Sequence, residues 1–85
     1  MSETVVKEKL RSTLKRMNVV QDLEQVKDDD NLFAAGVLDS LTLVQYVLLL
    51  EDEFGVRIEN SDIGYDQFQS FQKIILILKE KYQIS

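Results

Sequence analysis

Ser40 is the residue of this chain whose type and position suggest a chemical function. It follows the segment Gly-Val-Leu-Asp (residues 36–39) and directly precedes an almost continuous apolar run over residues 41–50. Asp or Ser before such a run is typical of a helix N-cap, so Ser40 by itself is interpreted as a cap. The same position puts its hydroxyl among unpaired N–H groups at the positive end of a helix, where an attached phosphate is tolerated.

The chain contains neither cysteine nor histidine. This excludes disulfides, zinc sites built from thiolate or imidazole, catalytic thiols and histidine as a general base. A modification of Ser40 would therefore need another enzyme, because this chain has no histidine to activate a serine. Since 85 residues also give only a small core, we expect a protein that is not an enzyme.

The acidic segment 28–31 is the other candidate site. Asp28 and Asp30 match the first and third positions of an EF-hand calcium loop. The match then fails, because Leu32 cannot be a ligand and Phe33 stands at the position that requires glycine. Asp39 stands where the bidentate glutamate belongs. We expect no metal site and interpret the segment as a turn.

Composition predicts one domain over residues 1–85, with no signal peptide, no membrane span and a cytoplasmic location. The formal charge is +3 over residues 1–18, −10 over 19–66 and +2 over 67–85. An acidic middle is a poor partner for nucleic acid and complements a basic protein patch, although acids also simply keep small domains soluble. We expect a monomer.

Apolar periodicity predicts three long helices and one short one. The first runs from Glu3 to Asn18 with Ser2 or Thr4 as its cap and its Lys and Arg side chains in solvent, and a long loop follows over 19–38. Segment 60–62 caps a turn at 63–65, and Ser70 caps the last helix. The fold class is all-α, a small four-helix bundle. The predicted apolar stripes are Val6, Leu10, Thr13, Leu14 and Met17; Leu43, Tyr46, Val47, Leu50 and Phe54; and Phe71, Ile74, Ile75, Leu78 and Tyr82.

The helix that begins at Ser40 has a second apolar side, formed by Leu41, Val44 and Leu48. A chain of this length cannot cover both sides, so we expect the second one to face a partner. Val47, Ile63, Phe68 and Ile75 could line a space for cargo, or be plain core.

Two motifs stand out in the sequence, LFxxGVLDSL over residues 32–41 and LEDEFGVRI over residues 50–58. Together they resemble the acyl carrier protein family, which includes peptidyl and D-alanyl carriers. The likeness covers about residues 3–82 in helix order, loop placement and length. It implies that a phosphopantetheinyl transferase attaches 4′-phosphopantetheine from coenzyme A to Ser40, beside the acidic Asp39. The thiol of this group would hold an acyl or aminoacyl cargo as a thioester.

The resemblance also implies partners and the surface that they contact. These partners are the transferase, a loading ligase or adenylation enzyme, and a downstream synthase or transferase. The implied contact surface is Leu41, Val44 and Leu48 with Glu51 and Asp52.

Three positions depart from the family pattern. Thr42 and Gln45 stand where the carriers of fatty-acid synthesis usually have acids, and Ala34 stands where many relatives have one. We therefore expect a dedicated pathway, such as a polyketide, nonribosomal peptide or D-alanylation route. The alternative function is a non-covalent acidic helical module that binds a partner through the same surface.

Overall fold

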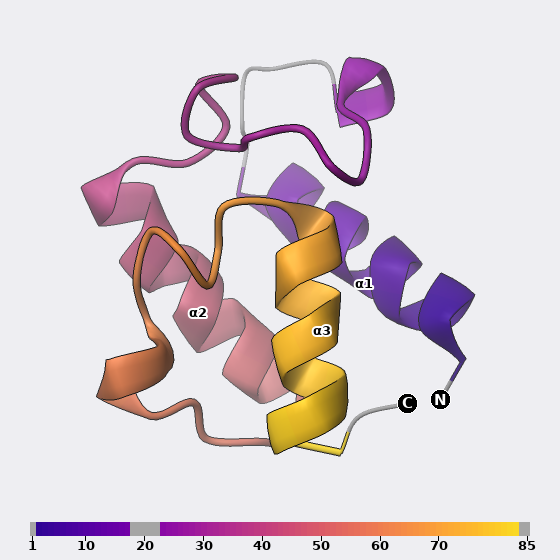
Figure 1. The fold of residues 1–85 in the computed structure, drawn as a ribbon, viewed down its shortest axis with the longest axis vertical. Coiled ribbons are helices and arrows are strands. Elements are labelled where there is room, and N and C mark those ends of the chain that lie inside the picture. The colour runs from indigo at the N-terminus through magenta and orange to yellow at the C-terminus, as the bar shows by residue number, and fades with distance from the viewer. Residues whose placement is uncertain (1, 18–22, 84–85) are drawn as a thin grey trace.

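Three α-helices form the framework of the computed structural model, which describes residues 2–17 and 23–83 (Figure 1). They are α1 (Glu3–Arg16), α2 (Ser40–Phe54) and α3 (Phe71–Lys81), and α1 packs against both others. Two single turns of 3-10 helix accompany them, η1 (Leu23–Gln25) and η2 (Asn60–Asp62). The all-α prediction is confirmed, with the short fourth helix reduced to a 3-10 turn. Within the described ranges, no helix is both long and apolar enough to cross a bilayer.

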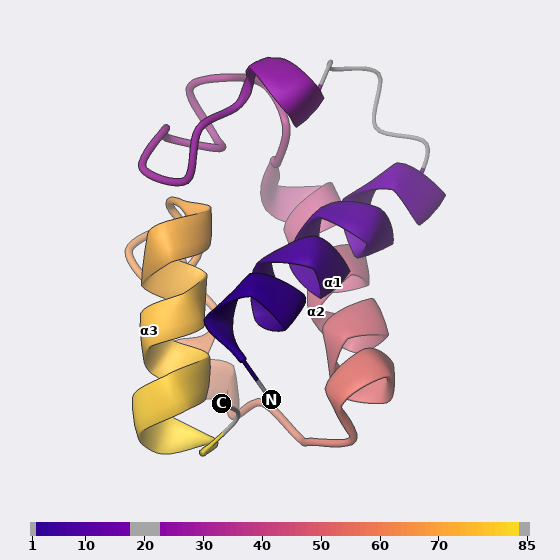
Figure 2. The same cartoon turned by 90° about the vertical axis from the view of Figure 1, so that its right-hand side faces the viewer.

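Segment 23–38 covers one end of the molecule, and α2 begins beneath it (Figures 1 and 2). The start of α1 and the end of α3 lie at the opposite end. The N-terminus of α2 is therefore presented at the end of the bundle that the long loop covers.

The helix ends follow local capping rules. Ser2 caps α1 by accepting a hydrogen bond from Val5 N, and Ser70 caps α3 by accepting one from Lys73 N. Gly55 ends α2 at φ +66°, a backbone conformation that favours glycine. Helix α1 ends at Arg16 with Met17 as its C-cap, whereas the predicted end, Asn18, lies outside the described residues.

The three predicted stripes meet in one core around Tyr46. The Tyr46 side chain is completely buried, and its hydroxyl donates a hydrogen bond of 2.9 Å to the carbonyl of Leu10 on α1. Burial raises the pKa of this phenol well above its usual value. Buried residues from the loops join this core: Leu23, Val26, Leu32, Val37, Leu38, Ile58 and Phe68.

The predicted turn at 63–65 is wrong by three residues, because the turn forms at 60–62. Asp62 was expected to act as a cap, but its side chain reaches the end of α3. Its carboxylate accepts hydrogen bonds from Lys81 Nζ at 3.0 Å and from the Tyr82 hydroxyl at 2.6 Å. The Tyr82 oxygen in turn accepts one from Glu59 N at 3.0 Å. This Asp62–Tyr82 contact fixes η2 on α3.

We expect Asp62→Asn to lower the free energy of unfolding by about 2 kcal/mol at neutral pH, because hydrogen bonds to a buried charge are lost. Lys81 first, and then Tyr82, lower the pKa of Asp62. A lowered pKa stabilises the fold above the unfolded-state pKa, and this contribution disappears as the pH falls through the folded-state pKa. Urea unfolding of both proteins at pH 7 and under strongly acidic conditions should show the difference only at pH 7. An equal difference at both pH values would contradict this assignment.

Candidate functional site

Asp39, not Ser40, is the N-cap of α2. The Asp39 Oδ1 atom accepts hydrogen bonds from Leu41 N at 3.0 Å and Thr42 N at 2.9 Å. The Thr42 hydroxyl oxygen accepts one from Asp39 N at 2.7 Å, which completes a reciprocal capping box. The N–H and hydroxyl of Thr42, followed by the N–H of Leu41, lower the pKa of the Asp39 carboxyl. The interpretation of Ser40 as a cap is therefore wrong.

Ser40 is the first residue of α2 and is exposed to solvent. Since Asp39 supplies the cap, the Ser40 hydroxyl has no hydrogen-bond partner among the described residues. Its oxygen is accessible to another enzyme and stands at the positive end of a 15-residue helix. This arrangement fits the attachment of a phosphate ester.

The loop before Ser40 is folded back on Leu32, whose side chain is completely buried. The carbonyl of Leu32 accepts hydrogen bonds from Val37 N at 2.9 Å and Leu38 N at 3.2 Å. Gly36 makes this reversal possible, because its φ of +78° lies in the left-handed region. Leu32, Val37 and Leu38 are all buried, and this fixes the backbone from which α2 begins.

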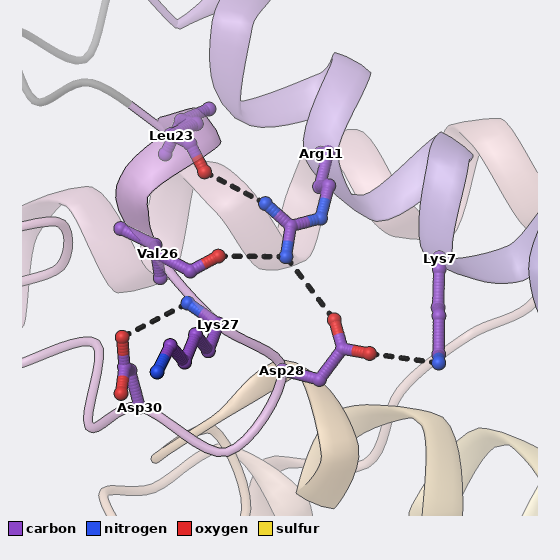
Figure 3. A network of polar contacts seen from close by, with 7 residues as sticks. All are labelled: Lys7, Arg11, Leu23, Val26, Lys27, Asp28 and Asp30. Atoms are coloured by element: carbon purple, nitrogen blue, oxygen red, sulfur yellow. Dashed lines mark hydrogen bonds and ion pairs between the residues drawn. The ribbon is translucent and has the colours of Figure 1, made fainter.

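Arg11 holds the first half of the same loop against α1 (Figure 3). Its guanidinium donates to the carbonyls of Leu23 at 2.7 Å and Val26 at 2.8 Å, and to Asp28 Oδ1 at 3.1 Å. It also lies 4.7 Å from the centre of the Phe71 ring on α3. The expectation that Arg11 points into solvent is wrong, because a planar group with five donors can satisfy several loop carbonyls at once.

Two of the three acids in the segment 28–30, Asp28 and Asp30, make contacts within the chain. Lys7 forms an ion pair of 2.7 Å with Asp28 Oδ2, while Arg11 binds Oδ1 (Figure 3). Lys7 first, and then Arg11, lower the pKa of Asp28. The Asp30 carboxylate accepts a hydrogen bond of 2.9 Å from Lys27 N, as in a turn. Asp28 and Asp30 therefore stabilise the loop.

The second apolar side of α2 is exposed, as the sequence predicts. The exposed fractions are 69% for Leu41, 53% for Val44 and 60% for Leu48. We call these three residues the α2 stripe. The opposite side is buried through Leu43, Tyr46, Val47 and Leu50. That a partner contacts the α2 stripe stays a prediction.

The acids at the end of α2 have three different environments. Glu51 is half-buried, and its Oε2 accepts a hydrogen bond of 2.6 Å from Ile58 N, so it holds the connector after α2. Glu53 pairs with Lys9 at 3.2 Å and with Arg16 on α1. Asp52 is exposed and has no ion pair within the described part of the chain. Of the two acids predicted to face a partner, Asp52 is free to do so.

We expect Glu51→Ala to lower the free energy of unfolding by about 1.5 kcal/mol, since a half-buried N–H loses a charged acceptor. Asp52→Ala is the matched control, because it removes a neighbouring carboxylate without a contact and should change stability by less than about 0.5 kcal/mol. Urea unfolding measures both. Equal stability of the two variants would mean that the contact between Glu51 and Ile58 contributes nothing.

Of the four residues that could line a space for cargo or be plain core, Val47, Phe68 and Ile75 are buried in the core and Ile63 packs against it. The four do not line one common hollow. Val47 and Ile63 line a shallow hollow of about 170 Å³ beside the α2 stripe. Phe68 is buried in the core, and Ile75 lines a different hollow between α3 and the start of α1. The other residues that line the first hollow are Val44, Leu48, Glu51, Ile58 and Asn60.

Comparison with known proteins gives consistent matches. Residues 4–78 match the family described as the phosphopantetheine attachment site. The D-alanyl carrier protein of Streptococcus uberis is 36% identical over 75 residues, which cover 88% of this chain and 92% of that protein. The D-alanyl carrier protein of Streptococcus gordonii is 40% identical over 55 residues, which cover 62% of this chain and 70% of that protein. The D-alanyl carrier protein of Streptococcus pyogenes serotype M5 is 36% identical over 61 residues, which cover 72% of this chain and 76% of that protein.

The family match extends from the first turn of α1 into the last turn of α3, so it includes all of α2, most of α1 and α3, and the segments between them. The S. uberis protein aligns over nearly its whole length. The chain therefore belongs to the phosphopantetheine attachment family: it is a non-catalytic carrier protein whose prosthetic group is 4′-phosphopantetheine.

Proposed function

We propose that Ser40 is the attachment residue and that the chain is a discrete carrier of an acyl or aminoacyl group. The observation that carries this proposal is the exposed Ser40 hydroxyl, which has no hydrogen-bond partner in the described structure because Asp39 caps α2. The Ser61 hydroxyl is also exposed and without a partner in the described structure, but it lies in the three-residue turn η2 and not at the start of a long helix. Three further serine hydroxyls are engaged. Those of Ser2 and Ser70 cap helices, and that of Ser12 donates to the carbonyl of Lys9.

The residues around Ser40 leave its hydroxyl exposed to solvent, and they do not activate it as a nucleophile. The Ser40 oxygen attacks the phosphorus that carries the pantetheine in coenzyme A, the P–O bond to the adenosine half breaks, and 3′,5′-adenosine diphosphate leaves. The transferase must supply the base that takes the serine proton, since this chain contains no histidine. Asp39 uses its carboxylate to hold the first turn of α2, which fixes the direction in which Ser40 points. When bound, 4′-phosphopantetheine supplies a thiol that holds the cargo as a thioester.

The names of the relatives support an aminoacyl cargo. The three proteins compared above are D-alanyl carrier proteins, so we propose D-alanine as the group carried by this chain. A ligase that activates the amino acid would load it, and a downstream transferase would remove it. Both enzymes, like the phosphopantetheinyl transferase, would contact the α2 stripe and Asp52 through an apolar surface with a basic rim. The hollow beside Val47 and Ile63 would receive a partner side chain or a small cargo.

Intact-protein mass tests the proposal directly. The unmodified protein is incubated with coenzyme A, Mg²⁺ and a broad-specificity phosphopantetheinyl transferase. We expect the gain of one phosphopantetheine group, followed by the gain of one alanyl group when D-alanine, a D-alanine ligase and ATP are added. A folded, unmodified sample that gains no mass would instead favour the non-covalent interaction module, for which the exposed α2 stripe is the supporting observation.

A further inference from the structure

Tyr65 lies beside the loop that leads to Ser40, and its hydroxyl has an unusual set of contacts. Its oxygen accepts hydrogen bonds from Asn31 Nδ2 at 2.6 Å and Gln69 Nε2 at 3.3 Å. The orientation of the Asn31 amide is fixed, because its Oδ1 accepts from Phe33 N and Ala34 N at 3.0 Å each. With two hydrogen bonds accepted, the phenol keeps its O–H as a donor to something outside the chain.

The surroundings of this phenol do not bury it. The side chain of Tyr65 is 49% exposed, while its ring lies 4.8 Å from that of Phe33, which is only partly buried. The two amide donors, Asn31 first, lower the pKa of Tyr65, and this makes its O–H a stronger donor. An oriented donor next to an aromatic wall is suited to a ligand that has both a carbonyl oxygen and apolar groups.

An arm attached to Ser40 is long enough to reach Phe33 and Tyr65. The bonds from Val37 N and Leu38 N to the Leu32 carbonyl place Phe33 next to Leu38. Leu38 lies only two residues, at most about 7 Å, before Ser40. The pantetheine arm has a backbone comparable to about four residues and so extends to about 14 Å. It carries two amide carbonyls and a pair of geminal methyl groups.

We propose that Tyr65 and Phe33 form a resting site for the pantetheine arm attached to Ser40. The Tyr65 hydroxyl donates to an amide carbonyl of the arm, and the Phe33 ring contacts its methyl groups. This inference rests on the proposed attachment at Ser40. The site holds the arm against the carrier between reactions, and partner enzymes must release the arm from it.

Nuclear magnetic resonance of the loaded protein, prepared with a ¹³C,¹⁵N-labelled arm, tests this site. We expect nuclear Overhauser effects between the arm methyl protons and the rings of Phe33 and Tyr65, and heteronuclear relaxation showing that the arm amides are ordered. Tyr65→Phe removes the hydroxyl and keeps the ring, so it should lower the ratio of docked to free arm roughly three- to tenfold. Tyr82→Phe is the control for lost stability, because it also removes a phenol oxygen and releases Asp62 but leaves the contacts of Tyr65 with Asn31 and Gln69 in place. It should leave the ratio of docked to free arm unchanged.

The outcomes separate this inference from the proposed function. Failure of the wild-type protein to gain the phosphopantetheine mass would overturn the attachment at Ser40. If the wild-type protein and Tyr65→Phe both gain that mass, the attachment stands and relaxation alone decides the resting site. Arm amides as mobile in the wild-type protein as in free pantetheine would overturn the site, as would equal order in the wild-type and Tyr65→Phe proteins.

Discussion

Ser40→Ala is expected to abolish phosphopantetheine loading completely while leaving the free energy of unfolding unchanged within about 0.5 kcal/mol. The loss is total because the hydroxyl oxygen is the atom that forms the new bond. The fold is unaffected because Asp39 makes the capping hydrogen bonds to Leu41 N and Thr42 N, and Ser40 makes none in the described structure. Intact mass after incubation with the transferase, together with urea unfolding, measures both quantities.

Ser70→Ala is the matched control, because it also removes a hydroxyl at a helix N-terminus. Ser70 is buried, and its oxygen accepts a hydrogen bond of 3.2 Å from Lys73 N. This variant should therefore lose about 1 kcal/mol of stability and still gain the full phosphopantetheine mass. Loading of the Ser40→Ala protein would disprove the attachment site, and a large loss of its stability would disprove the assignment of Asp39 as the cap.

Ser40 and Ser70 show which part of the helix capping could be predicted from the sequence and which part could not. Both precede apolar helical runs, and the sequence predicts a cap at either position. At Ser70 the prediction is confirmed, whereas at Ser40 the neighbouring Asp39 takes the cap through an extended backbone and a reciprocal bond with Thr42. Which of two adjacent capping residues is used depends on the backbone of the preceding loop. That backbone is set by the bonds of Val37 N and Leu38 N to the Leu32 carbonyl and by the bond of Leu32 N to the distant Gln69 carbonyl.

Periodicity predicted the helices because each one repeats its buried residues within a few turns. The roles of Arg11 and Asp62 have no local signal. Arg11 binds carbonyls up to 15 residues away, and Asp62 binds side chains 19 and 20 residues away. The resemblance to carrier proteins placed Glu51 on the surface that partners contact, yet the return of the chain at Ile58 gives it an acceptor role. Polar contacts between distant segments therefore could not be predicted from the sequence and were identified only from the structure.

The largest effect expected away from Ser40 is that of Leu48→Asp on recognition by partner enzymes. Leu48 lies in the α2 stripe with 60% of its side chain exposed, so aspartate at this position should change the free energy of unfolding little. In a complex, however, the variant loses the burial of a leucine, worth about 1.5–3 kcal/mol, and places a charge in an apolar contact. We expect kcat/KM for phosphopantetheine transfer to fall by at least about tenfold.

Leu76→Asp makes the same chemical change on another helix. Leu76 lies on α3 with 52% of its side chain exposed, close to the value for Leu48, and the substitution adds the same charge. If the α2 stripe is the recognition surface, Leu76→Asp should change kcat/KM less than about twofold. Equal losses in the two variants would point to a general effect of negative charge, and no loss in either would exclude the α2 stripe as the contact surface.

Comparing the single variants Leu48→Asp and Ser40→Ala distinguishes a carrier from a non-covalent module. In a module, the α2 stripe alone binds the partner, so Ser40→Ala binds normally and only Leu48→Asp fails. In a carrier, the affinity of the unmodified protein for the transferase also depends on the α2 stripe, but delivery of cargo requires both residues. Transfer from a preloaded Leu48→Asp protein to a downstream enzyme should therefore be slow although its thioester is intact, because the thioester must be presented to that enzyme through the α2 stripe.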